Sequence, residues 1–129
     1  MSKGHWQGFP SRLRVGAHDI KVRVVSAASL NADGEIVHGE YDSMRQTYSF
    51  SDAAPSKSSA ADTALHEVCH TLLEPLGLDE EDEERVCFVL GGGLVQVLRN
   101  NPKLLEWLSD LKDDKANGSN NGRARVRKK

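Results

Sequence analysis

Residues 59–74 read SAADTALHEVCHTLLE, and their apolar side chains recur at helical spacing. Ser59 followed by Asp62 fits a capping box, which predicts that a helix begins here. Pro75 disfavours helical geometry in the residue before it, so we expect the helix to end near Glu74. One stripe of the helix is predicted to be buried, and it comprises Ala61, Leu65, Val68 and Leu72. The stretch therefore predicts an amphipathic helix that packs against the rest of the fold.

Two histidines and a glutamate, His66, Glu67 and His70, stand within this helix. Side chains four residues apart lie on one face, so the two imidazoles can point at one metal ion. Glu67 is rotated by roughly 60° from His70 about the helix axis, which places its carboxylate beside such an ion as a general base. Zinc accepts nitrogen and oxygen ligands and lowers the pKa of its bound water to roughly 7. The spacing predicts one zinc ion per chain, held by His66 and His70, with Glu67 as the catalytic base.

A catalytic zinc ion needs a third protein ligand, and acidic residues follow the motif. The candidates are Glu74, Asp79 and the run Glu80, Glu81, Asp82, Glu83 and Glu84. In a second helix Glu83 shares the inward face of Val86, Cys87 and Leu90, whereas Glu84 aligns with Phe88. We therefore expect Glu83 to be the third ligand, with Glu84 as the alternative. Cys69 also has ligand chemistry, but a buried thiol packed as a small apolar group is the commoner role.

Strands are predicted before the helices, so the expected fold class is α+β. Residues 20–24 alternate apolar and charged side chains, as a half-buried strand does, and residues 35–51 contain one or two further strands. A second helix is expected to begin after Asp79 and to end near residue 100, and a third follows Pro102. We thus expect a small N-terminal sheet of two to four strands packed on the His-Glu-x-x-His helix and two further helices.

Composition narrows the class of protein. Residues 113–129 hold six basic and two acidic residues, which leaves about −6 for the rest of the chain. A dedicated nucleic-acid-binding domain would not be expected to carry a net negative charge. We therefore interpret the basic residues of 123–129 as part of a solvated tail, and contact with nucleic acid is the less favoured interpretation. Neither a membrane span nor a secretion signal is visible, and two cysteines are too few for a disulfide framework. We expect a cytoplasmic protein with a flexible segment 1–11, one domain over 12–112 and a disordered tail over 113–129.

The segments TALHEVCHTLLEPLGL (63–78) and EEDEERVCFVLGGGLVQVLRNNP (80–102) resemble the small His-Glu-x-x-His proteins of bacteriophages and bacteria. That family is similar to minimal gluzincins and, more distantly, to ImmA/IrrE-type peptidases. The resemblance covers roughly residues 59–108. It implies a zincin-like domain, a zinc-dependent peptidase activity, and a glutamate of the second helix as third ligand, but it implies no particular substrate.

Two functions remain open on these grounds. The first is a zinc metallopeptidase in which Glu67 activates water against a peptide or protein substrate. The alternative is a non-catalytic module in which zinc stabilises a small fold that binds a protein partner. Glu67 favours the enzyme, because a structural zinc site needs no base. Gly91, Gly92 and Gly93 interrupt the second helix, where they either allow close approach to the first helix or kink the second.

Overall fold

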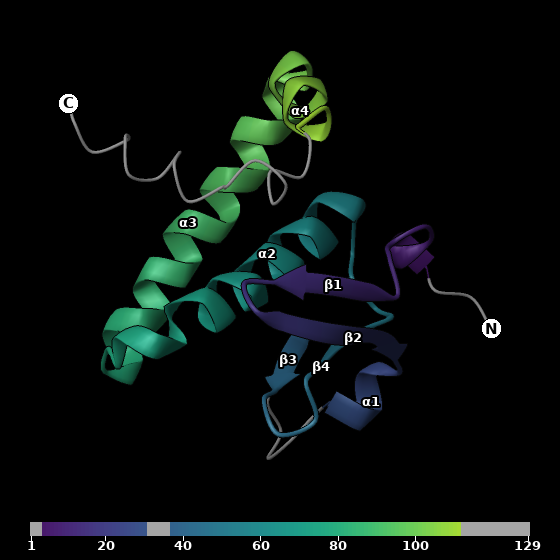
Figure 1. Cartoon of the computed structure of the whole chain (residues 1–129). Coiled ribbons are helices and arrows are strands. Elements are labelled where there is room, and N and C mark those ends of the chain that lie inside the picture. The colour runs from purple at the N-terminus through teal and green to yellow at the C-terminus, as the bar shows by residue number, and fades with distance from the viewer. Residues whose placement is uncertain (1–3, 31–36, 112–129) are drawn as a thin grey trace. The chain divides into compact units, whose positions relative to one another are not determined.

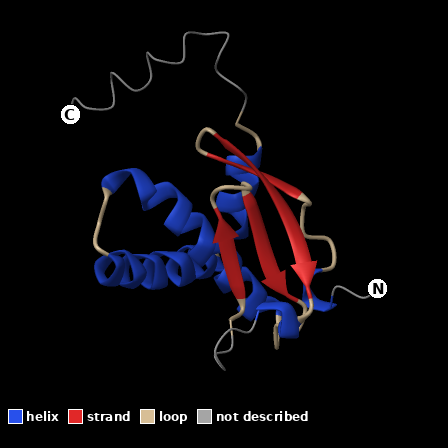
Figure 2. Cartoon of the chain, turned by 90° about the horizontal axis from the view of Figure 1, so that it is seen from below, coloured by secondary structure: helices blue, strands red, loops and turns tan. Residues whose placement is uncertain are grey.

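The computed structural model of the chain describes residues 4–30 and 37–111, and it has the expected α+β architecture. Four strands form one sheet, β1 (Arg12–Val15), β2 (His18–Val25), β3 (Gly39–Asp42) and β4 (Thr47–Ser51). Their order across the sheet is β1-β2-β4-β3, so β3 lies at an edge (Figure 1). β1 pairs antiparallel with β2 and β3 antiparallel with β4, while the central pair β2 and β4 is parallel. Figure 2 shows the strands side by side in red.

The alternation predicted for the β2 segment is confirmed. Ile20 and Val22 are buried, whereas Lys21 and Arg23 between them are exposed. On the neighbouring strand Tyr48 and Phe50 are buried with them. One face of the sheet therefore forms the core, as the period of two requires.

The core also includes a residue from a segment that we expected to be flexible. Trp6, in the short 3-10 helix Gly4–Trp6, is buried and stacks on Phe50 with a centroid separation of 4.3 Å. Its indole nitrogen donates a hydrogen bond to the carbonyl oxygen of Ser51. Residues 4–11 consequently belong to the folded domain. For residues 4–11 the expectation of a flexible segment was wrong, because a Gly-rich composition conceals one large aromatic anchor.

Helix α2 (Lys57–Leu73) packs on the core face of the sheet, and it differs from the predicted helix in its start and in its rotation. It begins three residues earlier, because Ser56 rather than Ser59 is the N-cap and accepts a hydrogen bond from the Ser59 amide. Its buried residues are Ala60, Ala64, Cys69 and Thr71, and Leu72 of the predicted stripe is 54% exposed.

The sheet-facing row of α2 thus lies about a quarter turn from the predicted stripe, at 100° per residue. Ala60 and Ala64 bring the helix backbone close to the aromatic side chains of the sheet. Leu65 and Val68 are only partly buried, at the margin of this contact. Small residues therefore define the packing face, because large aromatics on the sheet already fill the core.

The remaining helices follow in the predicted order. The short helix α1 (Ala27–Leu30) lies between β2 and β3 in sequence, and the 3-10 helix η2 (Glu74–Leu76) follows α2. Helix α3 spans Glu80–Asn100, and Asp79 caps it by accepting a hydrogen bond from the Asp82 amide. Helix α4 spans Pro102–Ser109 with proline in its first turn. None of the helices in the described part of the chain is long and apolar enough to span a bilayer.

The chain divides into two compact units, Met1–Val97 and Leu98–Lys129. The first unit contains the sheet, α2 and most of α3, and therefore all of the predicted site residues. The second contains the end of α3 and helix α4. The basic tail 113–129 lies outside the described residues.

Candidate metal centre

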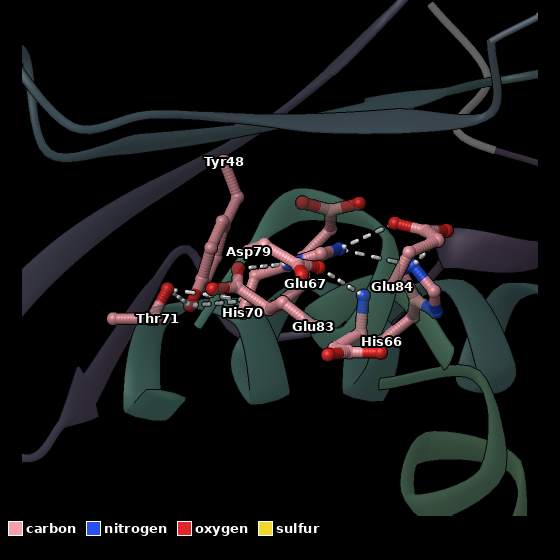
Figure 3. Close-up of polar contacts among 9 residues, drawn as sticks. Tyr48, His66, Glu67, His70, Thr71, Asp79, Glu83 and Glu84 are labelled. Carbon is pink, nitrogen blue, oxygen red and sulfur yellow. Dashed lines mark hydrogen bonds and ion pairs between the residues drawn. The ribbon is translucent and has the colours of Figure 1, made fainter. Parts of the chain in front are cut away.

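His66 and His70 project from the same face of α2, as their spacing predicts, and point at each other (Figure 3). Their Nε2 atoms are 3.2 Å apart, and each imidazole keeps only about a fifth of its side-chain surface exposed. The carboxylate of Glu84 on α3 spans the pair. Its Oε2 lies 3.0 Å from Nε2 of His66, and its Oε1 lies 3.0 Å from Nε2 of His70. Two nitrogens and a carboxylate therefore converge on one point.

These atoms fit a tetrahedral zinc ion. Two nitrogen ligands at 2.0–2.1 Å from zinc lie roughly 3.3–3.4 Å apart in a tetrahedron, close to the separation of the two Nε2 atoms. The donor set, two imidazoles and a carboxylate, is one that zinc accepts. Mutual repulsion of their lone pairs also requires something positive between them, a proton or a metal ion. His66, His70 and Glu84 thus form a group that could hold a metal ion.

Glu83, the first choice from the sequence, occupies a different position from the one expected. Its carboxylate lies 2.6 Å from Nδ1 of His70, on the far side of the imidazole from Glu84. Glu83 is half-buried with 22% of its side chain exposed, whereas Glu84 is 59% exposed. The inward orientation predicted for Glu83 is therefore correct. In that orientation the Glu83 carboxylate contacts Nδ1 of His70, whereas the Glu84 carboxylate contacts the Nε2 atoms of both histidines.

The Glu83 contact fixes the His70 ring. A carboxylate at Nδ1 accepts the proton there and leaves Nε2 with a lone pair available to a metal ion. Burial acts to lower the pKa of His70. The hydrogen bond that His70 donates to Glu83 and the charges of Glu67, Glu84 and Glu83 outweigh burial and raise that pKa. The surrounding carboxylates therefore favour a positive charge at this imidazole, which either a proton or a metal ion on Nε2 supplies.

Glu67 lies beside the converging atoms and is half-buried. Burial raises the pKa of its carboxyl to about 7; His70 acts against this rise, while Glu84 and Glu40 add to it. A carboxylate whose pKa lies near neutrality can both accept and return a proton. This is the electrostatic setting that the predicted role of Glu67 requires.

Both cysteines are buried and neither forms a disulfide. Cys69, weighed as a ligand because of its spacing from His66, packs in the interior, and burial raises the pKa of its thiol. Cys87 is also buried, and burial together with neighbouring charges raises its pKa to about 12. Its sulfur lies within reach of His70 and Glu83 in a second group of possible ligands. Because the Cys87 side chain is fully buried, this group is the less accessible of the two to an incoming ion.

Gly91 explains how α3 carries Glu84 to the histidines. A Cβ atom at this position would lie 3.0 Å from both the Cα and the amide nitrogen of His66. Only glycine permits α3 to cross the His66 backbone so closely. Of the two roles considered for the glycine run, close approach is therefore the one that Gly91 has, while Cβ atoms at Gly92 and Gly93 would meet nothing within 4 Å.

A buried polar pair beneath α2 was not found from the sequence. The hydroxyl of Tyr48 lies 2.7 Å from that of Thr71, which itself donates to the Glu67 carbonyl oxygen. Tyr48 therefore supports the helix turn that carries Glu67. The only feature of the sequence that could have indicated this pair is Thr71, one residue after His70.

A cleft of about 650 Å³ opens beside the converging atoms. Edge strand β3 and the residues before it contribute Val37, His38 and Gly39, and α2 contributes Asp62, Thr63, His66 and Glu67. The α3 wall comprises Glu84, Phe88, Val89 and Gly92. The cleft gives a ligand access to the metal-binding group from one side.

No protein-family model, curated protein or solved structure matches this chain.

Proposed function

We propose that this protein is a zinc-dependent peptidase whose metal ligands are His66, His70 and Glu84 and whose general base is Glu67. The observation that supports this most is the convergence of two imidazole nitrogens, 3.2 Å apart, with a carboxylate whose two oxygens each lie 3.0 Å from one of them, at the side of an open cleft. A structural zinc site is closed by four protein ligands, whereas a catalytic site has three and an open position. Three ligands beside a cleft correspond to the catalytic arrangement.

Each protein residue at the proposed site has a separate role. A zinc ion held by these residues would supply Lewis acidity, which would lower the pKa of a water molecule and polarise a peptide carbonyl. Glu67 is placed to accept the proton of water in the cleft and to return it to the departing amine. Glu83 holds the His70 ring through Nδ1 and so presents Nε2 to the metal. Gly91 sets the distance between α2 and α3 and thereby the position of Glu84.

Edge strand β3 offers a way to bind the substrate backbone. One side of β3 pairs with β4, and no strand of residues 4–30 or 37–111 pairs with its other side. An extended peptide can add to such an edge by main-chain hydrogen bonds. Because Gly39 at the start of β3 lines the same cleft as His66, a peptide bound in this way would pass the metal-binding group.

The substitution Glu67→Gln tests the proposal. Glutamine retains the size and much of the hydrogen bonding of glutamate, but it cannot accept the proton. The variant should keep its zinc, measured by mass spectrometry, and should lose at least about 10²–10⁴-fold in hydrolysis of a peptide library.

Two results would oppose the peptidase. Equal hydrolysis by wild type and Glu67→Gln would exclude the role of Glu67. A zinc-loaded wild type that cleaves nothing in the library would instead favour the zinc-stabilised binding module.

A further inference from the structure

The cleft beside the metal-binding group has an apolar wall. Phe88 and Val89 of α3 line it, and they are 74% and 67% exposed. Val37 lies among the lining residues before β3. When an apolar ligand covers an exposed aromatic and an exposed aliphatic side chain at a cleft, the buried apolar surface contributes favourably to the binding free energy.

Gly92 keeps this wall accessible. It lines the cleft, and a Cβ atom there would meet nothing within 4 Å, so packing between the helices does not require glycine at this position. Glycine is nevertheless one of the poorest residues for a helix interior. Gly93 is just as unobstructed but does not line the cleft. The consequence of glycine at 92 is space beside Phe88 and Val89.

The cleft lining also carries negative charge. Asp62 lies one helical turn before His66 on α2 and lines the cleft with Glu67 and Glu84. Across residues 4–30 and 37–111, Asp62 forms no ion pair, and the cleft lining includes neither lysine nor arginine. If Glu84 and Glu67 serve the metal ion and water, the carboxylate of Asp62 remains for a ligand. A basic side chain is its chemical complement.

We infer that the cleft selects peptide segments in which a large apolar side chain lies beside a lysine or arginine. The apolar side chain packs on Phe88 and Val89 over Gly92, and the basic side chain reaches Asp62. That the ligand is a peptide rests on the proposed function, but the selection itself requires binding and not cleavage. Asp62 of α2 and Phe88 and Val89 of α3 line the same cleft, and successive side chains of an extended peptide point to opposite sides of its backbone, so two neighbouring residues of one peptide can contact both.

The experiment measures binding, so that it is independent of hydrolysis. The Glu67→Gln protein is presented to an array of hexapeptides Gly-Gly-X-Z-Gly-Gly, in which X and Z run through all residues except cysteine. Peptides with a leucine or phenylalanine next to a lysine or arginine should bind about tenfold more tightly than those with serine in place of the apolar residue. Exchanging the basic residue for glutamate should weaken binding by a further factor of about 2–5.

Matched variants test the preference for apolar residues and the preference for basic residues separately. Gly92→Leu should abolish the preference for large apolar residues, while Gly93→Leu should keep it, although both substitutions improve helix propensity. Asp62→Asn should remove the preference for lysine and arginine, while Glu74→Gln, an exposed acid outside the cleft, should keep it. Melting curves verify that each variant is folded.

The inference is overturned if serine and leucine peptides bind alike, or if Gly92→Leu and Gly93→Leu have the same preference. Loss of the lysine preference in Glu74→Gln but not in Asp62→Asn would equally overturn it. A protein with this selectivity that hydrolyses none of the preferred peptides would refute the proposed peptidase and leave the selectivity intact.

Discussion

The substitution Gly91→Ala tests the close crossing of α2 and α3. The new methyl group would lie 3.0 Å from the Cα and N atoms of His66 and 3.3 Å from the carbonyl carbon of Leu65. All three are backbone atoms, which cannot rotate away as a flexible side chain would. The helices must therefore separate by several tenths of an ångström to restore ordinary contact.

Two opposing terms set the magnitude. Replacing glycine by alanine in a helix interior contributes about 1 kcal/mol of stability. Overpacking a buried contact costs about 1–3 kcal/mol. We expect the second term to exceed the first, for a net loss of about 1 kcal/mol. Gly93→Ala, whose methyl group meets nothing within 4 Å, should gain most of the helix term. The two variants should therefore differ by about 2 kcal/mol in the free energy of unfolding.

Urea denaturation of the metal-free proteins, followed by circular dichroism, measures this difference. Metal-free protein is required so that weaker zinc binding is not counted as lost packing. Zinc affinity, measured separately, should fall in Gly91→Ala, because Glu84 moves away from the histidines with α3. A Gly91→Ala protein as stable as Gly93→Ala would refute the close crossing and, with it, the explanation of how Glu84 reaches the histidines.

Three further predictions follow from individual contacts. Glu84→Gln should weaken zinc binding more than Glu83→Gln does. For Glu83→Gln we expect a loss of about 10–100-fold in zinc affinity, because Glu83 orients the ligand His70. A competition titration that gives the reverse order would restore Glu83 as the ligand. Ser56→Ala should destabilise the protein by about 0.5–2 kcal/mol through loss of the N-cap, whereas Ser59→Ala should change little, and thermal melts that reverse the two would move the helix start back to residue 59. Tyr48→Phe should cost about 1–2 kcal/mol in urea denaturation because its buried threonine partner loses a hydrogen bond, and an unchanged midpoint would contradict that bond.

Local patterns predicted the helices and the site motif well. The His66 and His70 pair, the Asp79 cap and the alternation in β2 all depend on spacings within one element, and periodicity determines these. For Glu83 and Glu84, the sequence could predict only which face of α3 each side chain occupies. That Glu83 faces inward was correct, but whether it meets Nδ1 or Nε2 of a histidine depends on the crossing of two helices.

Long-range packing accounts for what was missed. The parallel pairing of β2 with β4 joins segments separated by more than twenty residues, and no local pattern encodes it. The stripe including Leu72 was predicted by hydrophobicity, yet the helix packs through Ala60 and Ala64 because Tyr48 and Phe50 fill the opposite face. Trp6 likewise joins the core through a stack on Phe50, which composition alone could not predict.

The central claim concerns which atoms hold the metal ion. Anomalous diffraction at the zinc absorption edge from a crystal of the zinc-loaded protein would locate the ion directly. We predict one ion per chain, bound to Nε2 of His66, Nε2 of His70 and the Glu84 carboxylate, with Glu83 remaining on Nδ1 of His70. An ion held instead by Glu83 and Cys87, or no ion between the two histidines, would contradict the account.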